Sequence, residues 1–207
     1  MTPTETPRAV ELSGSHTKVE LPLDEGFDGV EIAGFGTLRV TIAEVPSLTV
    51  TTDRSYLDRV LHAVEEDAEA GCSVLRLGNV EARDGVRPLL VFDLEVPSLS
   101  YLHAMGASVA NASSVDLSGE SITVLASGKA RVMTGVLATE QLNIQASGGS
   151  WIRIDGIDAD DLAVDAHDGS LVMVEEGYDV AGEVVMLTGV ARFENPRTRA
   201  VAAANPR

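Results

Sequence analysis

Cysteine is nearly absent from this chain of 207 residues, which contains Cys72 alone. A single thiol excludes an intramolecular disulfide and a cysteine-rich metal site. Because Cys72 stands close to Val74 and Leu75, we expect it to be a small buried hydrophobic residue.

Aromatic residues and long apolar runs are also scarce. Phe, Trp and Tyr make up 4% of the residues, so a core drawn from the 44% hydrophobic content must be largely aliphatic. No apolar run approaches the ~18 residues of a membrane span, and we expect no membrane insertion. The polar start, MTPTETPRAVELSGSHT, lacks the apolar stretch of a secretory signal. The sequence therefore predicts a cytoplasmic protein, or one whose leader lies outside this chain.

Basic residues are few, with 15 Lys and Arg against 32 Asp and Glu, which gives a formal charge of −17. Such a field repels phosphate backbones, so nucleic acid is excluded as an expected partner, and anionic lipid surfaces are disfavoured. Cations, basic proteins and neutral glycans remain open as partners. The simpler interpretation is that the charge keeps the protein soluble.

The C-terminal half contains a motif that returns every 20 to 22 residues: a small residue, then Gly or Asp two positions later, then another small residue. A fixed period of this length is typical of a solenoid. The five copies are HAMGAS at His103–Ser108, LASGKA at Leu125–Ala130, QASGGS at Gln145–Ser150, DAHDGS at Asp165–Ser170 and MLTGVA at Met186–Ala191.

Aligned on this motif, apolar and small residues alternate with polar ones, which is the pattern of strands with one buried face. We therefore predict an all-β fold, a parallel β-solenoid whose rungs have about three sides. The Gly position, occupied once by Asp168, would be a corner with positive φ. The inward columns are Leu102, Val124, Ile144, Val164 and Val185; Ala104, Ala126, Ala146, Ala166 and Leu187; Ser108, Ala130, Ser150, Ser170 and Ala191; and Leu117, Leu137, Ile157 and Tyr178.

The remaining segments give the expected domain organisation. Residues 1–17 are predicted to be a disordered lead-in, 18–195 a single solenoid domain and 196–207 a flexible tail. Within the domain, 18–95 form an N-terminal β portion that caps or extends the stack, its last strand leading directly into the regular rungs of 96–195. Residues 54–70 are ambiguous, because Leu57, Val60, Leu61 and Val64 have helical spacing whereas the flanking sequence is strand-like.

The order of segments resembles the bacterial head GIN domain family, described as putative auto-transporter adhesins and also as a domain of unknown function. The resemblance rests on FDGVEIAGFGTLRVTIAEVPSLTV at Phe27–Val50, SYLDRVLHAVEED at Ser55–Asp67 and LEVPSLSYLHAMGASV at Leu94–Val109, and covers roughly 20–195. It implies a right-handed β-helix on an exported or surface-attached bacterial protein. It also favours strand over helix for 57–66, and it brings no catalytic residues.

An enzyme acting on carbohydrate is the alternative function, because β-solenoids can carry acidic residues along an outer face. A glycosidase needs two carboxyl groups about 5–10 Å apart. The outward column His103, Leu125, Gln145, Asp165, Met186 does not supply two carboxylates, and neither does the column Val109, Arg131, Trp151, Leu171, Arg192. We expect no catalytic residues and no cofactor.

The densest acidic segment is DGIDADD at Asp155–Asp161, followed by Asp165 and Asp168. Closely spaced carboxylates can hold Ca²⁺, but the spacing matches no EF-hand loop. We favour a solvated corner with Asp turn hydrogen bonds over a calcium site. The four histidines are too scattered to predict a metal site.

An apolar stripe is the strongest candidate for an interaction site. Trp151 lies between inward Ser150 and Ile152, so its ring should point outward, with Leu171 stacked beside it. Exposed stripes of this kind mark contact sites. The predicted stripe comprises Val109, Arg131, Met133, Trp151, Arg153, Leu171 and Met173, with Arg192 at its rim.

Three covers for the stripe remain open: residues 18–50 of the same chain, a second copy, or a glycan or foreign protein. The function we predict is a non-enzymatic binding or scaffold domain of the bacterial cell envelope, adhesin-like and of unknown ligand. A third hypothesis is a cytoplasmic solenoid that polymerises end to end, which would need an unprotected terminal rung.

Overall fold

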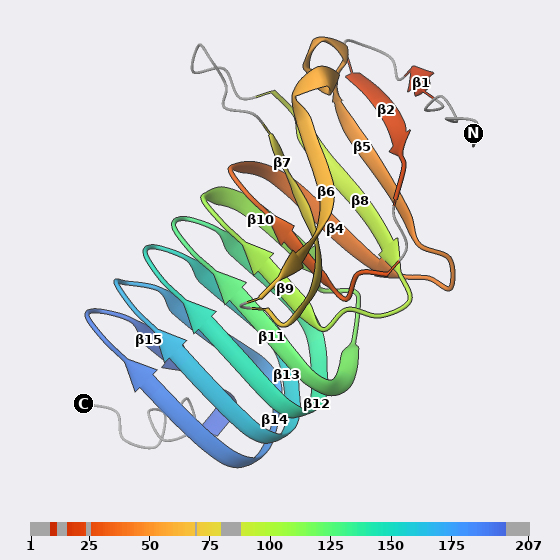
Figure 1. The fold of residues 1–207 in the computed structure, drawn as a ribbon. Coiled ribbons are helices and arrows are strands. Elements are labelled where there is room, and N and C mark those ends of the chain that lie inside the picture. Colours follow the sequence, from red (N-terminus) through yellow and green to blue (C-terminus); the bar gives the residue numbers. More distant parts are fainter. Residues whose placement is uncertain (1–8, 12–15, 24–25, 69, 80–87, 198–207) are drawn as a thin grey trace.

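The computed structural model describes residues 9–11, 16–23, 26–68, 70–79 and 88–197. Its strands join in one curled sheet that forms a β-solenoid of about four turns, which confirms the all-β solenoid prediction. Figure 1 shows the rungs stacked along one axis, with the N-terminal strands at the upper end and β15 at the lower. No helix among the described residues is long and apolar enough to cross a membrane.

Strand β12 (Arg131–Ala146) shows how one rung is built. It pairs in parallel with β13 (Trp151–Ala166), and the pairing skips Gly135 and Glu140. These two interruptions divide the rung into three straight segments, in agreement with the predicted three sides. The inward side chains of the rung are buried; they are Val132, Thr134, Leu137, Leu142, Ile144 and Ala146.

The neighbouring rungs keep the same register. Strand β13 pairs with β14 (Leu171–Leu187), and on the other side β12 pairs with β10 (Ala107–Ala112) and β11 (Leu117–Ala126). Strand β11 pairs in turn with β9 (Tyr101–Ala104). The core is therefore a set of columns of aliphatic side chains, each stacked on its counterpart one rung away.

The turns between rungs confirm the predicted glycine column. Gly106, Gly128 and Gly148 have φ of 75°, 73° and 71°, and Asp168 has φ of 54°. A Cβ at Gly128 would lie 3.0 Å from the carbonyl oxygen of Gly106, and a Cβ at Gly148 would lie 2.8 Å from that of Gly128. The left-handed conformation and the close approach of the backbones both favour glycine.

Buried serines fasten these turns to the rungs beneath. Ser150 Oγ donates to the carbonyl oxygen of Ala126 at 3.1 Å, and Ser170 Oγ donates to that of Ala146 at 3.0 Å. The Ser108 hydroxyl lies 3.2 Å from the carbonyl oxygen of Ile32 on the neighbouring rung and 2.8 Å from that of Met105 in its own turn. Each hydroxyl is small enough for the crowded corner, and its hydrogen bond removes the cost of burying a polar group.

The N-terminal portion contains rungs whose order in space differs from their order in the chain. Strands β3 (Gly29–Ile32) and β4 (Phe35–Ile42) pair with β9 and β10 on one side, and with β7 (Cys72–Asn79) and β8 (Leu90–Val96) on the other. The β3–β4 rung thus lies between the strand at 90–96 and the first regular rung. Along the chain, β8 does lead into β9 as predicted, but in space β3–β4 occupies the position beside the regular rungs.

Antiparallel strands close the N-terminal end of the stack. Beyond β8 come β5 (Ser47–Asp53), β2 (His16–Leu21) and β1 (Ala9–Glu11), so strand structure begins within the predicted disordered lead-in. Residues 1–8 and 12–15 of that lead-in lie outside the described residues, as do 198–207 of the predicted tail.

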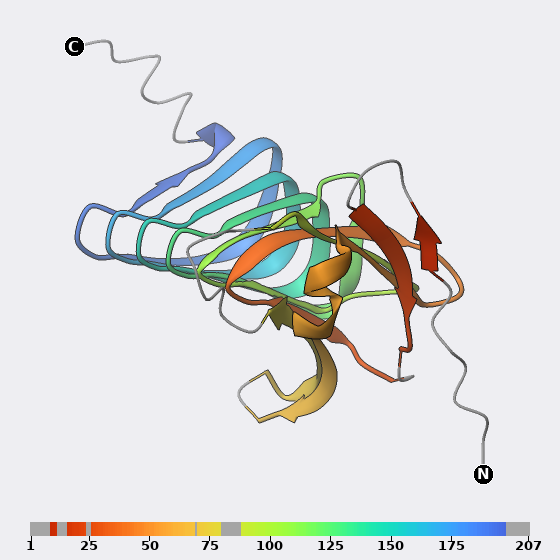
Figure 2. The same ribbon diagram turned by 90° about the horizontal axis from the view of Figure 1, so that it is seen from above.

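Residues 54–67 settle the ambiguity between helix and strand. They form a 3-10 helix, η1 (Arg54–Arg59), and then strand β6 (Val60–Asp67), antiparallel to β7. The α-helical alternative is wrong, because Val60 and Val64 are partly buried while Leu61 between them is exposed, which is strand alternation. Figure 2 shows the β6–β7 hairpin projecting beyond the outline of the stacked rungs.

The last rung departs from the predicted columns. Strand β15 (Arg192–Glu194) pairs with Leu171–Met173 of β14 only. Leu187 occupies the inward column of Ala166 but is 46% exposed, so its predicted burial is wrong. The physical reason is that no described strand lies beyond this part of β14.

We expect Gly128→Ala to lower the free energy of unfolding by about 1–3 kcal/mol, because it forces a Cβ into a left-handed turn against a carbonyl oxygen. Gly149→Ala is the matched control, since the nearest atom to its Cβ is at 3.7 Å and its φ is not positive. Denaturant unfolding of both variants checks this. Equal losses in the two variants would contradict the role given to the turn.

Candidate binding face

The predicted outward column exists as a continuous register across the rungs. Val109 pairs with Arg131, Arg131 with Trp151, Trp151 with Leu171, and Leu171 with Arg192. Since parallel strands are about 4.8 Å apart, the side chains of one column stand in contact range of their neighbours. The structure thus places the members of this column one above another on a sheet face.

A second outward column runs beside the first. It pairs Asn111 with Met133, Met133 with Arg153, and Arg153 with Met173. We call the set Val109, Arg131, Met133, Trp151, Arg153, Leu171 and Met173 the side face. All seven predicted residues therefore come from adjacent positions on four consecutive rungs, those of β10, β12, β13 and β14.

The apolar side chains of the side face are partly buried, whereas Arg131 is exposed. Arg153 lies 3.3 Å from a carboxylate oxygen of Glu175 and 3.6 Å from one of Asp155, so its charge is neutralised locally. Arg131 and Arg192 have no acidic partner among the residues that the structure describes. Two unneutralised guanidinium groups thus flank Trp151 and Leu171 on a chain of formal charge −17.

Two glycines lie in the turns beside this column. Gly149 and Gly169 precede Ser150 and Ser170 and are both exposed. Neither position carries a side chain beside Trp151 and Leu171, whereas the equivalent turn position one rung earlier is Lys129.

Residues 18–50 do not cover the side face. The described part of this segment lies in β2, β3, β4 and β5, which extend the stack edge to edge beyond β10 and β9. The self-cover alternative is therefore wrong for these residues, because their hydrogen bonds are used to continue the sheet.

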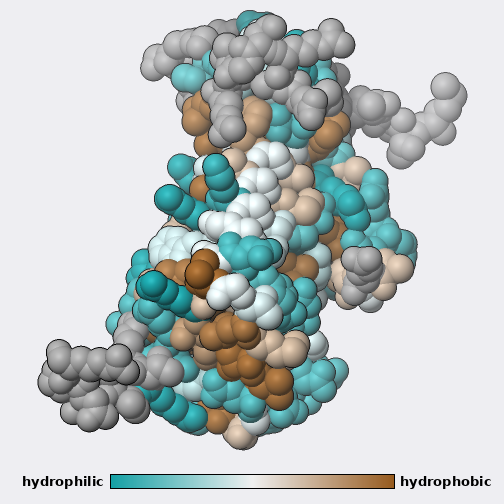
Figure 3. Space-filling view, turned by 90° about the vertical axis from the view of Figure 1, so that its left-hand side faces the viewer, coloured by the Kyte–Doolittle hydropathy of each residue, from teal (hydrophilic) through white to brown (hydrophobic). Residues whose placement is uncertain are grey.

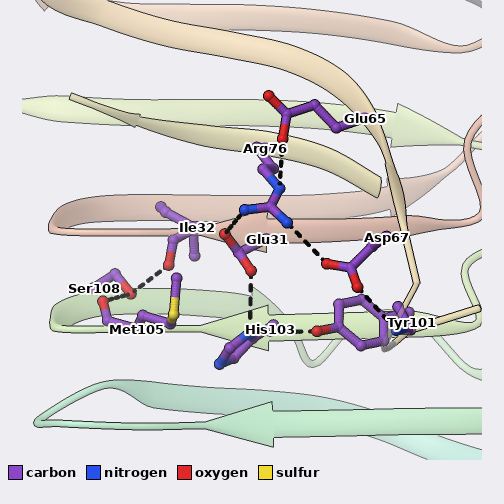
Figure 4. A network of polar contacts seen from close by, with 10 residues as sticks. Glu31, Ile32, Glu65, Asp67, Arg76, Tyr101, His103, Met105 and Ser108 are labelled. Carbon is purple, nitrogen blue, oxygen red and sulfur yellow. Dashed lines mark hydrogen bonds and ion pairs between the residues drawn. The ribbon is translucent and has the colours of Figure 1, made fainter. Parts of the chain in front are cut away.

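The outward column that contains His103 ends in a network of charged residues that the sequence did not predict. His103 pairs with Glu31 across β9 and β3, and Glu31 pairs with Arg76 across β3 and β7. Figure 4 shows the Arg76 guanidinium surrounded by three carboxylates. Its nitrogens lie 2.8 Å from Asp67, 3.2 Å from Glu65 and 3.6 Å from Glu31.

Glu31 is the most buried member of this network, with 8% of its side chain exposed. Its second oxygen lies 3.2 Å from Nδ1 of His103, and that nitrogen lies 3.4 Å from the hydroxyl of Tyr101. A buried carboxylate needs such partners. The close acids here are engaged by Arg76 and His103, and the arrangement fastens the β6–β7 hairpin to the stack.

The Tyr101 hydroxyl and the Cys72 thiol lie beside the network, and its negative charge raises the pKa of both. Burial, then the nearby Glu31, Asp67 and Cys72, raise the pKa of Tyr101 to about 12. Burial, then Asp28 and Asp67, raise the pKa of the Cys72 thiol. Cys72 is partly rather than fully buried, contrary to the expectation from its neighbours, because it lies at the start of β7 next to the hairpin turn.

The acidic segment 155–168 is spread over several positions of the rung. Asp158 pairs with Asp179, Asp161 with Gly182 and Asp165 with Met186, so the carboxylates leave β13 at separate points. Asp165 lies 2.8 Å from Nε2 of His167. Within the described ranges, no three His, Cys, Asp or Glu side chains come together in a way that could hold a metal ion.

We expect Arg76→Met to lower the free energy of unfolding by about 1–3 kcal/mol, because it leaves the buried Glu31 carboxylate without its arginine partner. Adding Glu31→Gln should recover part of the loss. Arg39→Met is the control, since its ion pair with Asp93 spans 3.6 Å and its side chain is 63% exposed. Urea unfolding of the three variants checks this, and an Arg76→Met loss no larger than that of Arg39→Met would contradict it.

We expect stability to fall as the pH rises from about 10 towards about 12. Tyr101 holds its proton more tightly in the folded state than in the unfolded state, so its contribution is present below the unfolded pKa and is lost through the folded one. Thermal unfolding across this range, with Tyr101→Phe beside the native chain, measures it. An unchanged slope in the variant would contradict the assignment.

The comparisons with known proteins agree with the observed fold. The family model described as "Putative auto-transporter adhesin, head GIN domain" matches residues 26–178. A solved structure described as a putative adhesin from Parabacteroides merdae aligns with a TM-score of 0.60 and 14% identity, over 90% of this chain and 98% of that one. A putative adhesin from Parabacteroides distasonis gives 0.54 and 12%, over 88% and 98%.

Both structural likenesses are at low identity and concern the fold. Among proteins with curated descriptions, none matches the sequence. The family match extends over most of the chain, from the β3–β4 rung to the middle of β14, and it coincides with the resemblance carried by Phe27–Val50, Ser55–Asp67 and Leu94–Val109. The chain therefore belongs to the head GIN domain family.

Proposed function

We propose that this protein is a non-enzymatic binding module of the bacterial cell surface, and that it contacts its partner through the side face. The observation that carries the proposal is the column in which Arg131, Trp151, Leu171 and Arg192 follow one another on consecutive rungs. An aromatic ring between unneutralised arginines is a common composition at the centre of protein contact sites.

The rigidity of the support favours binding by this face. Trp151 and Leu171 stand on strands whose inward neighbours Ile152 and Val172 are fully buried. Hydrogen bonds to a rung on either side fix both strands. A contact surface held in this way loses little conformational entropy when a partner binds.

The cell-surface location rests on the family. Its model is described as a "Putative auto-transporter adhesin", and the two solved structures named above are described as putative adhesins. Those descriptions belong to those proteins, and they support an extracytoplasmic, adhesin-like role for this chain. A partner that offers anionic groups and a flat apolar surface, whether glycan or protein, would match the side face.

A carbohydrate-active enzyme gains no specific support from the described residues. Such an enzyme needs a pair of carboxyl groups free to act as acid and base. Glu31, Glu65 and Asp67 do lie near one another, but Arg76 pairs with all three. A single function, binding, therefore accounts for the side face.

Two screens test the proposed binding: glycan arrays with neutral and acidic sugars, and capture of bacterial surface proteins. The affinity of each captured ligand is then measured. We expect the double variant Trp151→Asp, Leu171→Asp to lower the affinity for the identified ligand at least about tenfold, because both side chains lie at the centre of the side face. Leu61→Asp is the matched control, an exposed apolar residue on β6. Binding that survives in the double variant, or that Leu61→Asp weakens equally, would overturn the proposal.

A further inference from the structure

The most exposed apolar side chains of the last rung lie at the C-terminal end of the stack and not on the side face. Val184 is 62% exposed, Met186 55%, Leu187 46% and Val190 78%. Figure 3 shows hydrophobic surface gathered towards this end of the molecule. On earlier rungs the counterparts of Leu187, such as Ala166 and Ala146, are buried because the next rung covers them.

The same stretch presents an open sheet edge. Strand β14 pairs with β13 along its length, whereas β15 reaches only Leu171–Met173 on the other side. From Tyr178 to Leu187, no described strand pairs with the outer edge of β14. Every second backbone N–H and C=O there is directed away from β13, which is a template for another strand.

From Val184 to Leu187 this edge lacks the charged side chains and prolines that keep sheet edges apart. Between Tyr178 and Leu187 the sequence has no lysine, arginine or proline, and its charged residues are Asp179 and Glu183. The edge at the N-terminal end of the same sheet face, β6, carries Glu65, Glu66 and Asp67. Charged side chains of this kind block pairing with a second chain.

We propose that a second copy of this chain pairs with the free edge of β14, antiparallel and about a two-fold axis through Val185. In this register Val184 of one copy lies opposite Met186 of the other, and Glu183 lies opposite Leu187. Val184 and Met186 stand on the outer face, in the columns of Ala163 and Asp165. Cross-strand side chains at about 5 Å then form one apolar patch.

Charge favours this partner over a head-to-tail stack. Joining β14 to β6 of another copy would bring Asp179 and Glu183 close to Glu66, the acid of β6 that Arg76 does not pair with, and the like charges would repel. In the two-fold register no acid lies opposite an acid. Because a two-fold contact uses the same edge from both copies, it closes the assembly at two chains and forms no fibre.

This inference is independent of the proposed function, because it uses none of the side-face residues. The predicted assembly is an elongated dimer with the capped N-terminal ends facing outward. Each copy would keep its own side face, so a dimer could contact two ligand groups at once.

Light scattering after size exclusion, over a wide range of concentrations of the full chain, tests the dimer. We expect a two-chain mass that Val184→Lys with Met186→Lys reduces to that of a folded monomer. Leu61→Lys on β6 and the Trp151→Asp, Leu171→Asp variant are controls that should keep the native mass. A native chain that is monomeric at every concentration, its edge then covered by its own residues, would overturn the proposal.

Charge complementation tests the register. A second double variant, Val184→Glu with Met186→Glu, should also be monomeric alone. Mixing the two variants should restore a two-chain mass, because each lysine then faces a glutamate across the axis. A mixture that stays monomeric while the native chain is a dimer would overturn the two-fold pairing, and so would a dimer split by the side-face variant alone.

Discussion

The close stacking of the turns between rungs is the contact on which the rest of this structure depends. At each turn a backbone N–H bonds to the rung before it: Lys129 N donates to the Gly106 carbonyl at 2.6 Å, and Gly149 N donates to the Gly128 carbonyl at 2.7 Å. These bonds require left-handed residues without bulk at the column of Gly106, Gly128 and Gly148. With the turns in register, the strands on either side are in register too, and the outward side chains form straight columns.

The two ends of the stack are built differently, and this difference organises the molecule. At the N-terminal end the sheet continues into antiparallel strands, with η1 between β5 and β6. Arg76 pairs with Glu65 and Asp67 within the β6–β7 hairpin and with Glu31 on β3. At the C-terminal end Phe193 packs near Tyr178, with ring centroids 6.2 Å apart, while no described strand pairs with the outer edge of the second half of β14. The stack of parallel rungs therefore ends at β14 and β15 with apolar side chains still exposed.

The sequence predicted the repeating part well because each rung repeats one local pattern. The inward columns, the corner role of Asp168 and the outward position of Trp151 all follow from period-2 alternation and a fixed repeat length. The placement of β3–β4 between 90–96 and 101–112 could not be predicted, because it depends on which distant strands pair. The Arg76 network was missed for the same reason: Glu31, Arg76 and Tyr101 meet only after β3, β7 and β9 lie side by side. The exposure of Leu187 depends on the absence of a following strand, which a column alignment does not reveal.

The central claim is that the turn column fixes the register that presents the outward faces. Amide hydrogen exchange of the full chain, resolved by residue, tests it most directly. The account predicts that the amides of Lys129 and Gly149 exchange as slowly as those of Val132 and Ile144 within the rungs, because all are released only when rungs separate. Fast exchange at the two turn amides, with the strand amides still protected, would show that the turns follow the strands and would contradict the account.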